Sequence, residues 1–262
     1  MAAIGMHDAK RRMAPHPPLP VYYADERHRL EYLADSFRAA APHYDGINRW
    51  MSFWTDRWYR RQALLRAGLG AGMDVADVGS GTGIVSELAR AIVGPGGHIV
   101  SIDPSAAMMA EAVAKGRVAA PVIGRAEALP VGDGSADFLC MGFALRHVAD
   151  LRTTFREYLR VLRPGGRLLL MEMTPPPRGM LKRVLKGYMR YVVPSVTRVT
   201  TGSGAATTLY AYCWDTFENC VPPEVILDAL TEAGFEAPSR RVVVRIFSEY
   251  TARKPFTSLS GV

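Results

Sequence analysis

The stretch VADVGSGTGIVSELA, residues 75–89, places three glycines within five positions, between an apolar run and a helix-like run. A strand that leads directly into a glycine-rich loop and then into a helix is typical of the first crossover of a nucleotide-binding sheet. Glycine tolerates positive φ and lets a ligand approach the main chain. We therefore expect Gly79, Gly81 and Gly83 to pass beneath a nucleoside, although a tight turn alone would use the same residues.

A carboxylate follows at the end of the next predicted strand. Asp103 closes the run IVSID, where its two oxygens can accept hydrogen bonds from both hydroxyls of an adenosine ribose. A dinucleotide loop requires Gly-x-Gly-x-x-Gly, but Ile84 occupies the sixth position counted from Gly79. NAD is therefore the poorer ligand, and an NAD-dependent oxidoreductase remains as an alternative function.

Strand-like and helix-like runs alternate around this loop. The alternation predicts βαβ crossovers and hence an α/β fold, with a Rossmann-like, doubly wound, mostly parallel sheet and helices on both of its faces. We expect a seven-stranded sheet, built from residues 73–78, 97–103, 120–123, 136–143 and 167–173 and a late strand or hairpin within 239–254.

The chain divides into an arm and one domain. The arm, residues 1–20, mixes prolines with basic side chains and is expected to be flexible or extended, whereas residues 21–262 form a single domain. Within the domain we expect aromatic lid helices at 21–70, a cofactor-binding core at 71–175, a helical acceptor-side region at 176–234, and carboxy-terminal strands with a tail at 235–262.

The composition narrows the classes of function. Apolar residues make up 48% of the chain, yet no window of about 18 residues is uninterruptedly apolar, which predicts a cytoplasmic protein without a membrane-spanning helix. The net charge of +7 is not gathered into a basic domain, so no nucleic-acid partner is expected. Cys140, Cys213 and Cys220 lack a Cys-x-x-Cys spacing and the histidines lack a His-x-x-x-His pair, so no metal is expected.

Six motifs follow one another in a recognisable order: FRAAAPHYDGINRWMSF at 37–53, VADVGSGTG at 75–83, IDPSAAM at 102–108, RAEALPVGDGSADFL at 125–139, GFALRHVADL at 142–151 and VLRPGGRLLLMEM at 161–173. With these motifs the chain resembles the ubiquinone/menaquinone biosynthesis C-methyltransferases, a family of class I S-adenosylmethionine-dependent methyltransferases. Weaker likeness continues through YMRYVVPSVTR, LYAYCWDTF and LTEAGFE. The resemblance implies an enzyme of quinone biosynthesis that uses S-adenosyl-L-methionine.

The resemblance also implies the reaction. The methyl group would go to a phenolic or quinol-like small molecule, at a ring carbon, and the acceptor could carry a lipid tail. Three alternatives stay open beside the oxidoreductase: an O- or N-methyltransferase of another small molecule, a methyltransferase of a phospholipid headgroup, and a cofactor-binding protein without catalysis.

Cofactor contacts are carried over from the family position by position. Relatives have Asp or Asn before the fourth strand, where it accepts from adenine N6, but this chain has Arg125, which is expected to stack, to form an ion pair or to turn away. Met108 would lie over the adenine or pack in the core. The implied set is Asp77, Gly79, Ser80, Gly81, Thr82, Gly83, Asp103, Pro104, Met108, Arg125, Ala126, Glu127, Gly142 and Phe143.

The predicted catalytic residues are Arg146, His147 and Tyr44. A quinol ring becomes nucleophilic at carbon when its hydroxyl loses a proton, so a base, or a cation that stabilises the phenolate, is needed. By resemblance Arg146 assists this step through water; the alternative is a buried ion pair with Glu172 or with an acid of the amino-terminal helices. His147 replaces the usual Asn and is expected to act as the base, to orient the acceptor, or to support the site through hydrogen bonds.

The acceptor pocket is also placed by resemblance. Tyr44 and Asp45 match a Tyr-Asp pair that could close over the cofactor as part of a lid. Glu249 departs from the family pattern and leaves the identity of the acceptor open. The implied acceptor-binding residues are Asp45, Asn48, Met51, Tyr188, Tyr210 and Tyr212.

Residues 178–190 predict a basic amphipathic helix, because Arg178, Lys182, Lys186 and Arg190 recur every four positions. One interpretation docks this helix against the inner face of a membrane or against a lipid-tailed acceptor. The other interpretation leaves its basic face solvated while the helix covers its own core. A homodimer is a further arrangement that the sequence leaves open.

Overall fold

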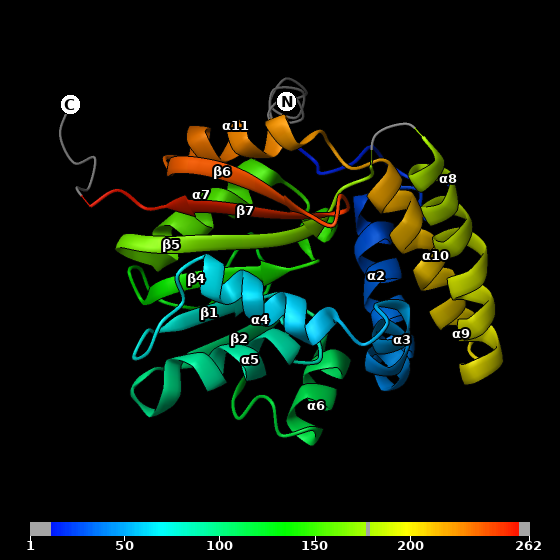
Figure 1. Ribbon diagram of the computed structural model, residues 1–262, viewed down its shortest axis with the longest axis horizontal. Coiled ribbons are helices and arrows are strands. Elements are labelled where there is room, and N and C mark those ends of the chain that lie inside the picture. The colour runs from blue at the N-terminus through cyan, green and yellow to red at the C-terminus, as the bar shows by residue number, and fades with distance from the viewer. Residues whose placement is uncertain (1–11, 177–178, 257–262) are drawn as a thin grey trace, which may run out of the picture.

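The computed structural model describes residues 12–176 and 179–256, and a single sheet runs through its centre (Figure 1). The strand order is β3-β2-β1-β4-β5-β7-β6. The first five strands are parallel, and β7 runs antiparallel to both β5 and β6. The strands are β1 (Val75–Val78), β2 (Ile99–Asp103), β3 (Pro121–Ile123), β4 (Ala136–Gly142), β5 (Leu162–Met173), β6 (Glu236–Val243) and β7 (Phe247–Arg253). The predicted seven-stranded, mostly parallel sheet is confirmed.

Helices cover both faces of the sheet, as a doubly wound fold requires. Side chains alternate along β4, so Leu139 and Met141 pack in a core with α7 and α11, whereas Phe138 and Cys140 pack in a second core with α4 and α5. The helices concerned are α4 (Asp56–Arg66), α5 (Ile84–Val93), α6 (Ala106–Ala114), α7 (Leu151–Val161) and α11 (Pro223–Ala233), with short 3-10 turns at η2 (Gly94–Gly96) and η3 (Leu145–His147).

A second group of helices, here called the helical cap, lies beyond the carboxyl ends of the parallel strands (Figure 1). It comprises α2 (Glu26–Ala40), η1 (Ala41–His43), α3 (Tyr44–Met51), α8 (Met180–Gly187), the π-helical turn η4 (Tyr188–Val192), α9 (Val193–Thr201) and α10 (Gly204–Glu218). The cap thus joins two segments that are more than a hundred residues apart, and α2 packs directly on α10. Because ligands of such sheets bind at the carboxyl ends of the strands, the cap stands over the expected site.

The described part of the predicted arm, residues 12–20, has no regular secondary structure, bends at Pro15 and His16, and is held by hydrogen bonds to two other segments. The Met13 amide donates to the Asp150 carboxylate over 2.9 Å, and the Met13 carbonyl accepts from Leu151 over 2.9 Å. The Pro15 carbonyl accepts from Val221 over 2.8 Å. This part of the arm therefore bridges the start of α7 and the segment before α11, while residues 1–11 lie outside the described residues.

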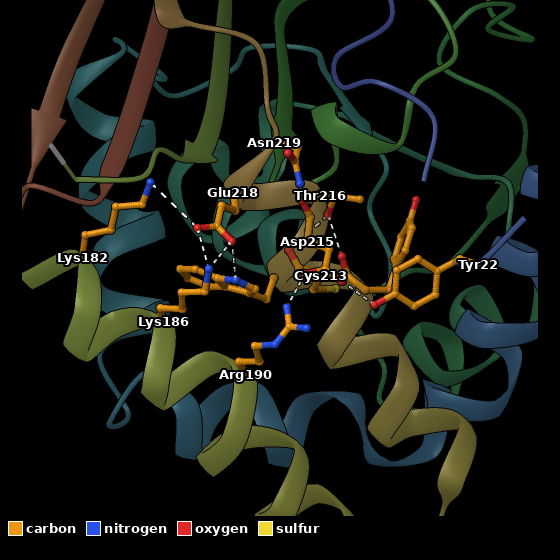
Figure 2. A network of polar contacts seen from close by, with 11 residues as sticks. Tyr22, Lys182, Lys186, Arg190, Cys213, Asp215, Thr216, Glu218 and Asn219 are labelled. Atoms are coloured by element: carbon orange, nitrogen blue, oxygen red, sulfur yellow. Dashed lines mark hydrogen bonds and ion pairs between the residues drawn. The ribbon is translucent and has the colours of Figure 1, made fainter. Parts of the chain in front are cut away.

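The predicted basic helix begins at Met180, so Arg178 lies outside the described residues. Its row of Lys182, Lys186 and Arg190 does not lie free in solvent, because all three pair with acids of α10 (Figure 2). Ion pairs to the cap therefore hold a row that the first interpretation left solvated, and docking of the helix on a membrane stays a prediction. No helix among residues 12–176 and 179–256 combines the length and apolar character needed to cross a bilayer.

Candidate active site

A cavity of about 380 Å³ opens between the helical cap and the carboxyl ends of β1, β2 and β4. Cavities of this order hold small ligands and cofactors in other proteins. It is lined by many of the predicted cofactor residues: Gly79, Gly81, Asp103, Pro104, Met108, Arg125, Ala126, Glu127, Gly142 and Phe143. Tyr44 and His147, from the predicted catalytic set, line it as well.

The glycine loop forms the floor of this cavity. All three glycines have positive φ, at 66° for Gly79, 55° for Gly81 and 77° for Gly83. A Cβ at Gly79 would stand 2.7 Å from Ala144, whereas a Cβ at Gly81 would meet no atom within 4 Å. Gly79 is therefore required by packing, and Gly81 keeps its side of the loop open. Gly83 does not line the cavity and caps α5 instead.

Asp103 presents a carboxylate that two backbone amides hold in place. One oxygen accepts from Gly81 over 2.8 Å and the other accepts from Ser105 over 2.8 Å. The side chain lies at the cavity wall, and its burial raises the pKa although both amides oppose the shift. Each oxygen has a further lone pair, so the carboxylate can still accept hydrogen bonds from a ligand.

Asp77 lies behind the loop rather than in the cavity wall. It is fully buried, and it accepts from the Ser86 hydroxyl over 2.6 Å and from the Cys140 thiol over 3.7 Å. Burial raises the pKa of Asp77 to about 6. Ser80, also predicted to touch the cofactor, donates to the Met109 sulfur over 3.3 Å. These residues are placed to support the loop from behind.

The end of the cavity near β3 differs from the family pattern in a defined way. Arg125 forms an ion pair with Glu127 over 3.3 Å, which is one of the three expected arrangements. The other Glu127 oxygen accepts from the Ala149 amide. Glu127 therefore brings a carboxylate to the cavity two residues after Arg125, the position expected to hold the hydrogen-bond acceptor for adenine.

Arg146 makes the buried ion pair that the sequence left as an alternative. Its Nη1 lies 2.7 Å from the Glu172 carboxylate, and both side chains are buried. Burial lowers and Glu172 raises the pKa of Arg146, with a net shift upward. The guanidinium does not line the cavity, so its charge acts on the site from behind η3.

His147 follows on the same turn and does reach the cavity. Its ring lies between Phe37, edge-on at 5.4 Å, and Tyr212, nearly parallel at 5.9 Å. Its Nδ1 is buried and has no hydrogen-bond partner among the described residues, so the predicted hydrogen-bonded supporting role is not seen. Burial, with Arg146 nearby, lowers the pKa of His147 well below its ordinary range, which keeps the imidazole neutral.

The predicted acceptor-binding residues lie in contacts within the cap and around it, not in the cavity wall. The Tyr210 hydroxyl donates to Asn48 over 3.3 Å, and the Tyr188 hydroxyl donates to the Met51 carbonyl over 3.1 Å. Tyr212 is fully buried against Tyr22 and Tyr23, which precede α2, and against Tyr32 of α2.

Asp45 and Thr82, one predicted for the acceptor and the other for the cofactor, bond to each other instead. Their contact fixes α3 against the glycine loop. Separately, the hydrogen bond from Tyr210 to Asn48 joins α10 to α3, so residues that the resemblance assigned to the acceptor hold parts of the structure together.

Two features in or directly behind the cavity wall were not predicted. The first is the apolar face of α2, with Leu30, Leu33 and Phe37 at the spacing of one helix face. That spacing was visible in the sequence, but it does not say which cavity the face borders. The second is Arg60, whose guanidinium lies 4.6 Å above the Phe143 ring and supports a residue with φ of 62°.

Comparison with known proteins shows which protein family this chain is similar to. Residues 25–243 match the model of the ubiE/COQ5 methyltransferase family. A demethylmenaquinone methyltransferase of Thermus thermophilus is 33% identical over 203 residues, which is 76% of this chain and 90% of that protein. A ubiquinone/menaquinone biosynthesis C-methyltransferase of Geobacter sulfurreducens is 33% identical over 220 residues, covering 80% of this chain and 83% of its own.

Solved structures give the fold alone. A SAM-dependent methyltransferase of Thermotoga maritima, described as a possible histamine N-methyltransferase, superposes with a TM-score of 0.59 at 18% identity, over 84% of this chain and 99% of that one. The [4+2]-cyclase SpnF superposes with a TM-score of 0.59 at 18% identity, over 86% of this chain and 96% of that one. Since a cyclase shares the fold, the chemistry must be argued from the site and the sequence family.

Proposed function

Because the chain belongs to the ubiE/COQ5 methyltransferase family, we propose that it transfers a methyl group from S-adenosylmethionine to a ring carbon of a quinol in quinone biosynthesis. The observation that carries the proposal is the cavity at the strand ends, where the glycine loop meets the Asp103 carboxylate. The family match extends over the cap as well as the core, so it includes the segments on the acceptor side.

The residues around the cavity fit an adenosine. The Asp103 oxygens, held by two amides, are suited to accept hydrogen bonds from the two ribose hydroxyls. The open side of Gly81 leaves room for the ligand against the main chain. Met108 supplies an apolar surface for the base, and the Glu127 carboxylate provides an acceptor near it.

S-adenosylmethionine supplies an electrophilic methyl group, and the chain must make the ring carbon nucleophilic. His147 is the cavity residue that can accept a hydrogen bond from the quinol hydroxyl, because its imidazole is neutral. Arg146 directly precedes His147 and is held by its ion pair with Glu172. Its guanidinium places a positive charge near the developing phenolate without contacting the phenolate. In this proposal His147 accepts the proton of the quinol hydroxyl, and the positive charge of Arg146 stabilises the phenolate.

The cap closes the reaction off from water. Tyr44 of α3 and the apolar side of α2 form the wall opposite the glycine loop. An apolar wall suits an aromatic ring and the start of a lipid tail. We include in the proposal that the acceptor carries such a tail and that the protein works in peripheral contact with the inner face of a membrane.

Isothermal titration and product analysis test this function. The protein should bind S-adenosylhomocysteine, and with S-adenosylmethionine it should methylate a short-tailed demethylmenaquinol. Carbon NMR of the product separates a new carbon–carbon bond from an O-methyl ether, and phosphatidylethanolamine offered in parallel tests N-methylation. Absence of any binding of S-adenosylhomocysteine, or a product methylated only at oxygen or nitrogen, would refute the proposed reaction.

A further inference from the structure

The basic row of α8 and η4 lies along α10 and pairs with its acids, while its side chains stay between 32% and 46% exposed (Figure 2). Lys186 Nζ lies 3.0 Å from both oxygens of Glu218, and Lys182 lies 3.9 Å from the same carboxylate. One turn further on, Arg190 lies 3.0 Å from Asp215. The ion pairs fix the rotation of the helix about its axis, so the side opposite the row must point outward.

That outward side is apolar, which reverses the usual arrangement of a surface helix. Leu185, Met189 and Val193 pack inward against Trp214 and its neighbours. Six other apolar side chains of this segment are between 44% and 85% exposed, and we call them the outer face: Met180, Leu181, Val184, Tyr191, Val192 and Val199. Several large apolar side chains exposed on one helical segment indicate a contact surface.

The charges on the outer face have one sign. Arg183 and Arg198 are exposed there, and neither forms an ion pair with an acid of the described residues. Between residues 179 and 203 the sequence contains no Asp or Glu. The outer face therefore combines apolar side chains with cations that lack a counter-charge.

The outer face continues into the loop between α3 and α4. The Tyr188 ring is stacked on Trp50 at 6.1 Å and on Phe53 at 6.2 Å. Phe53 and the neighbouring Trp54 are both more than 60% exposed and both have positive φ. This loop follows the last residue of α3, and the cavity residue Tyr44 is the first, so one short helix connects the surface with the cavity.

We propose that the outer face docks on the surface of an anionic phospholipid bilayer. Apolar side chains with flanking arginines match the interface of such a bilayer, where each cation near the surface gains attraction. A second copy of the chain is a poorer occupant, because it would bring the arginines of two outer faces together without an acid between them. The inference deepens the proposed function and rests on it for the lipid-tailed acceptor.

Vesicle sedimentation of the full chain tests the docking directly. The protein should bind vesicles of phosphatidylcholine with phosphatidylglycerol, and bind phosphatidylcholine alone more weakly. The double variant Val184→Glu with Val199→Glu should bind the anionic vesicles roughly tenfold or more weakly, because it places two like charges against the lipid. Val242→Glu, at an exposed position on β6, is the matched control and should bind as the wild type does.

A second pair of changes isolates the charge. Arg183→Gln with Arg198→Gln should remove most of the preference for the anionic vesicles while leaving weak binding to phosphatidylcholine. Thermal unfolding of every variant should match that of the wild type, since the altered side chains are exposed. Equal vesicle binding by the Val184→Glu/Val199→Glu variant, or a wild-type dimer that this variant dissolves, would overturn the proposal.

Activity separates this inference from the proposed function. Without vesicles, methyl transfer to a short-tailed, water-soluble quinol should be the same in the wild type and in the Val184→Glu/Val199→Glu variant. With a long-tailed quinol embedded in anionic vesicles, only the variant should slow down. A wild type that binds vesicles but methylates neither quinol would contradict the proposed function and support the docking surface.

Discussion

Thr82, in the glycine loop, donates the hydrogen bond of its hydroxyl to the carboxylate of Asp45, on α3. The same carboxylate accepts from Arg117 over 2.6 Å and pairs with Lys115 over 3.0 Å. Arg117 also donates to the Thr82 carbonyl over 3.0 Å. One acid of the helical cap is thus fastened to three groups of the core, and the cap is held over the cavity at the loop that forms its floor.

Asp45→Asn should loosen this contact and speed the release of the cofactor. The change removes the charge that Arg117 and Lys115 share, and a hydrogen bond between charged groups contributes about 1.5–3 kcal/mol. We expect S-adenosylhomocysteine to dissociate roughly tenfold or more faster in stopped-flow measurements. Thr82→Val removes only the neutral donor and should have a smaller effect. Equal release rates for Asp45→Asn and the wild type would mean that the cap does not retain the ligand.

The same contact should weaken in acid. The bonds from Thr82 and Arg117 outweigh the burial that opposes them, so the pKa of Asp45 is lowered in the folded protein. A lowered carboxyl pKa gives stability that is present above the unfolded value and is lost as the pH falls through the folded one. The difference in free energy of unfolding between wild type and Asp45→Asn should therefore shrink below about pH 4. A difference that stays constant from pH 7 to pH 3 would contradict this assignment.

Asp103→Asn should weaken cofactor binding without unfolding the protein. The amide keeps one oxygen for the Gly81 or Ser105 amide, but it loses the charge and one of the two oxygens that we propose accept from the ribose. From the cost of a hydrogen bond to a charged group we expect a loss of roughly 10- to 100-fold in affinity for S-adenosylhomocysteine. Titration calorimetry measures it, and an unchanged affinity would remove Asp103 from the cofactor site.

The glycine loop and Asp103 could be predicted because their conformations are local. Positive φ at Gly79, Gly81 and Gly83 follows from the residue type and from the strand before them, and the position of Asp103 follows from the parallel pairing of β2 with β1. Both follow from residues 75–103, the first crossover, although the close packing of Gly79 against Ala144 does not. The parallel direction of β1 to β5 likewise follows from the helices that alternate with these strands, whereas the strand order, with β4 beside β1 and β7 beside β5, was not predicted.

The sequence predicted that the cap is helical, but it did not predict which face of each cap helix contacts the rest of the protein. The direction of the basic row depends on Glu218, which lies more than thirty residues after Lys182, and a helical period cannot state which of two faces finds its partner. The place of Tyr210 against Asn48 depends on the packing of α10 on α3 in the same way. Family resemblance assigned these side chains to an acceptor, whereas tertiary packing engages them with one another.

Asp77→Asn should change how stability depends on pH. Burial raises the pKa of Asp77 from an ordinary 3.8 to about 6, so the protonated form is favoured in the folded state. Stability from a raised carboxyl pKa is present below the unfolded value and is lost as the pH rises through the folded value. The shift of about two units corresponds to roughly 3 kcal/mol. Relative to Asp77→Asn, the wild type should lose up to that amount between pH 4 and pH 7 in urea unfolding.

Glu172→Gln should strongly destabilise the protein. The change leaves the buried Arg146 guanidinium without its charge partner, and breaking a buried pair in this way costs about 3–5 kcal/mol. Urea denaturation measures the loss. The double variant Arg146→Met with Glu172→Met removes both charges and should cost less than Glu172→Gln alone. If the double variant is the less stable of the two, the pair contributes net stability beyond mutual neutralisation.

His147→Asn tests the remaining step of the proposed mechanism. The imidazole lines the cavity and its Nδ1 has no partner among the described residues, so the change breaks no hydrogen bond of the fold. If His147 handles the quinol proton, kcat should fall roughly tenfold or more, while the affinity for S-adenosylhomocysteine stays the same. Phe37→Leu removes the edge-on ring contact but keeps the imidazole, and it should alter stability more than kcat.

Because burial lowers the pKa of His147 well below 6.5, the wild-type rate should not decline through protonation of His147 until the pH is clearly below that value. Equal turnover by His147→Asn and the wild type would exclude the imidazole and leave the charge of Arg146 as the means of stabilising the phenolate.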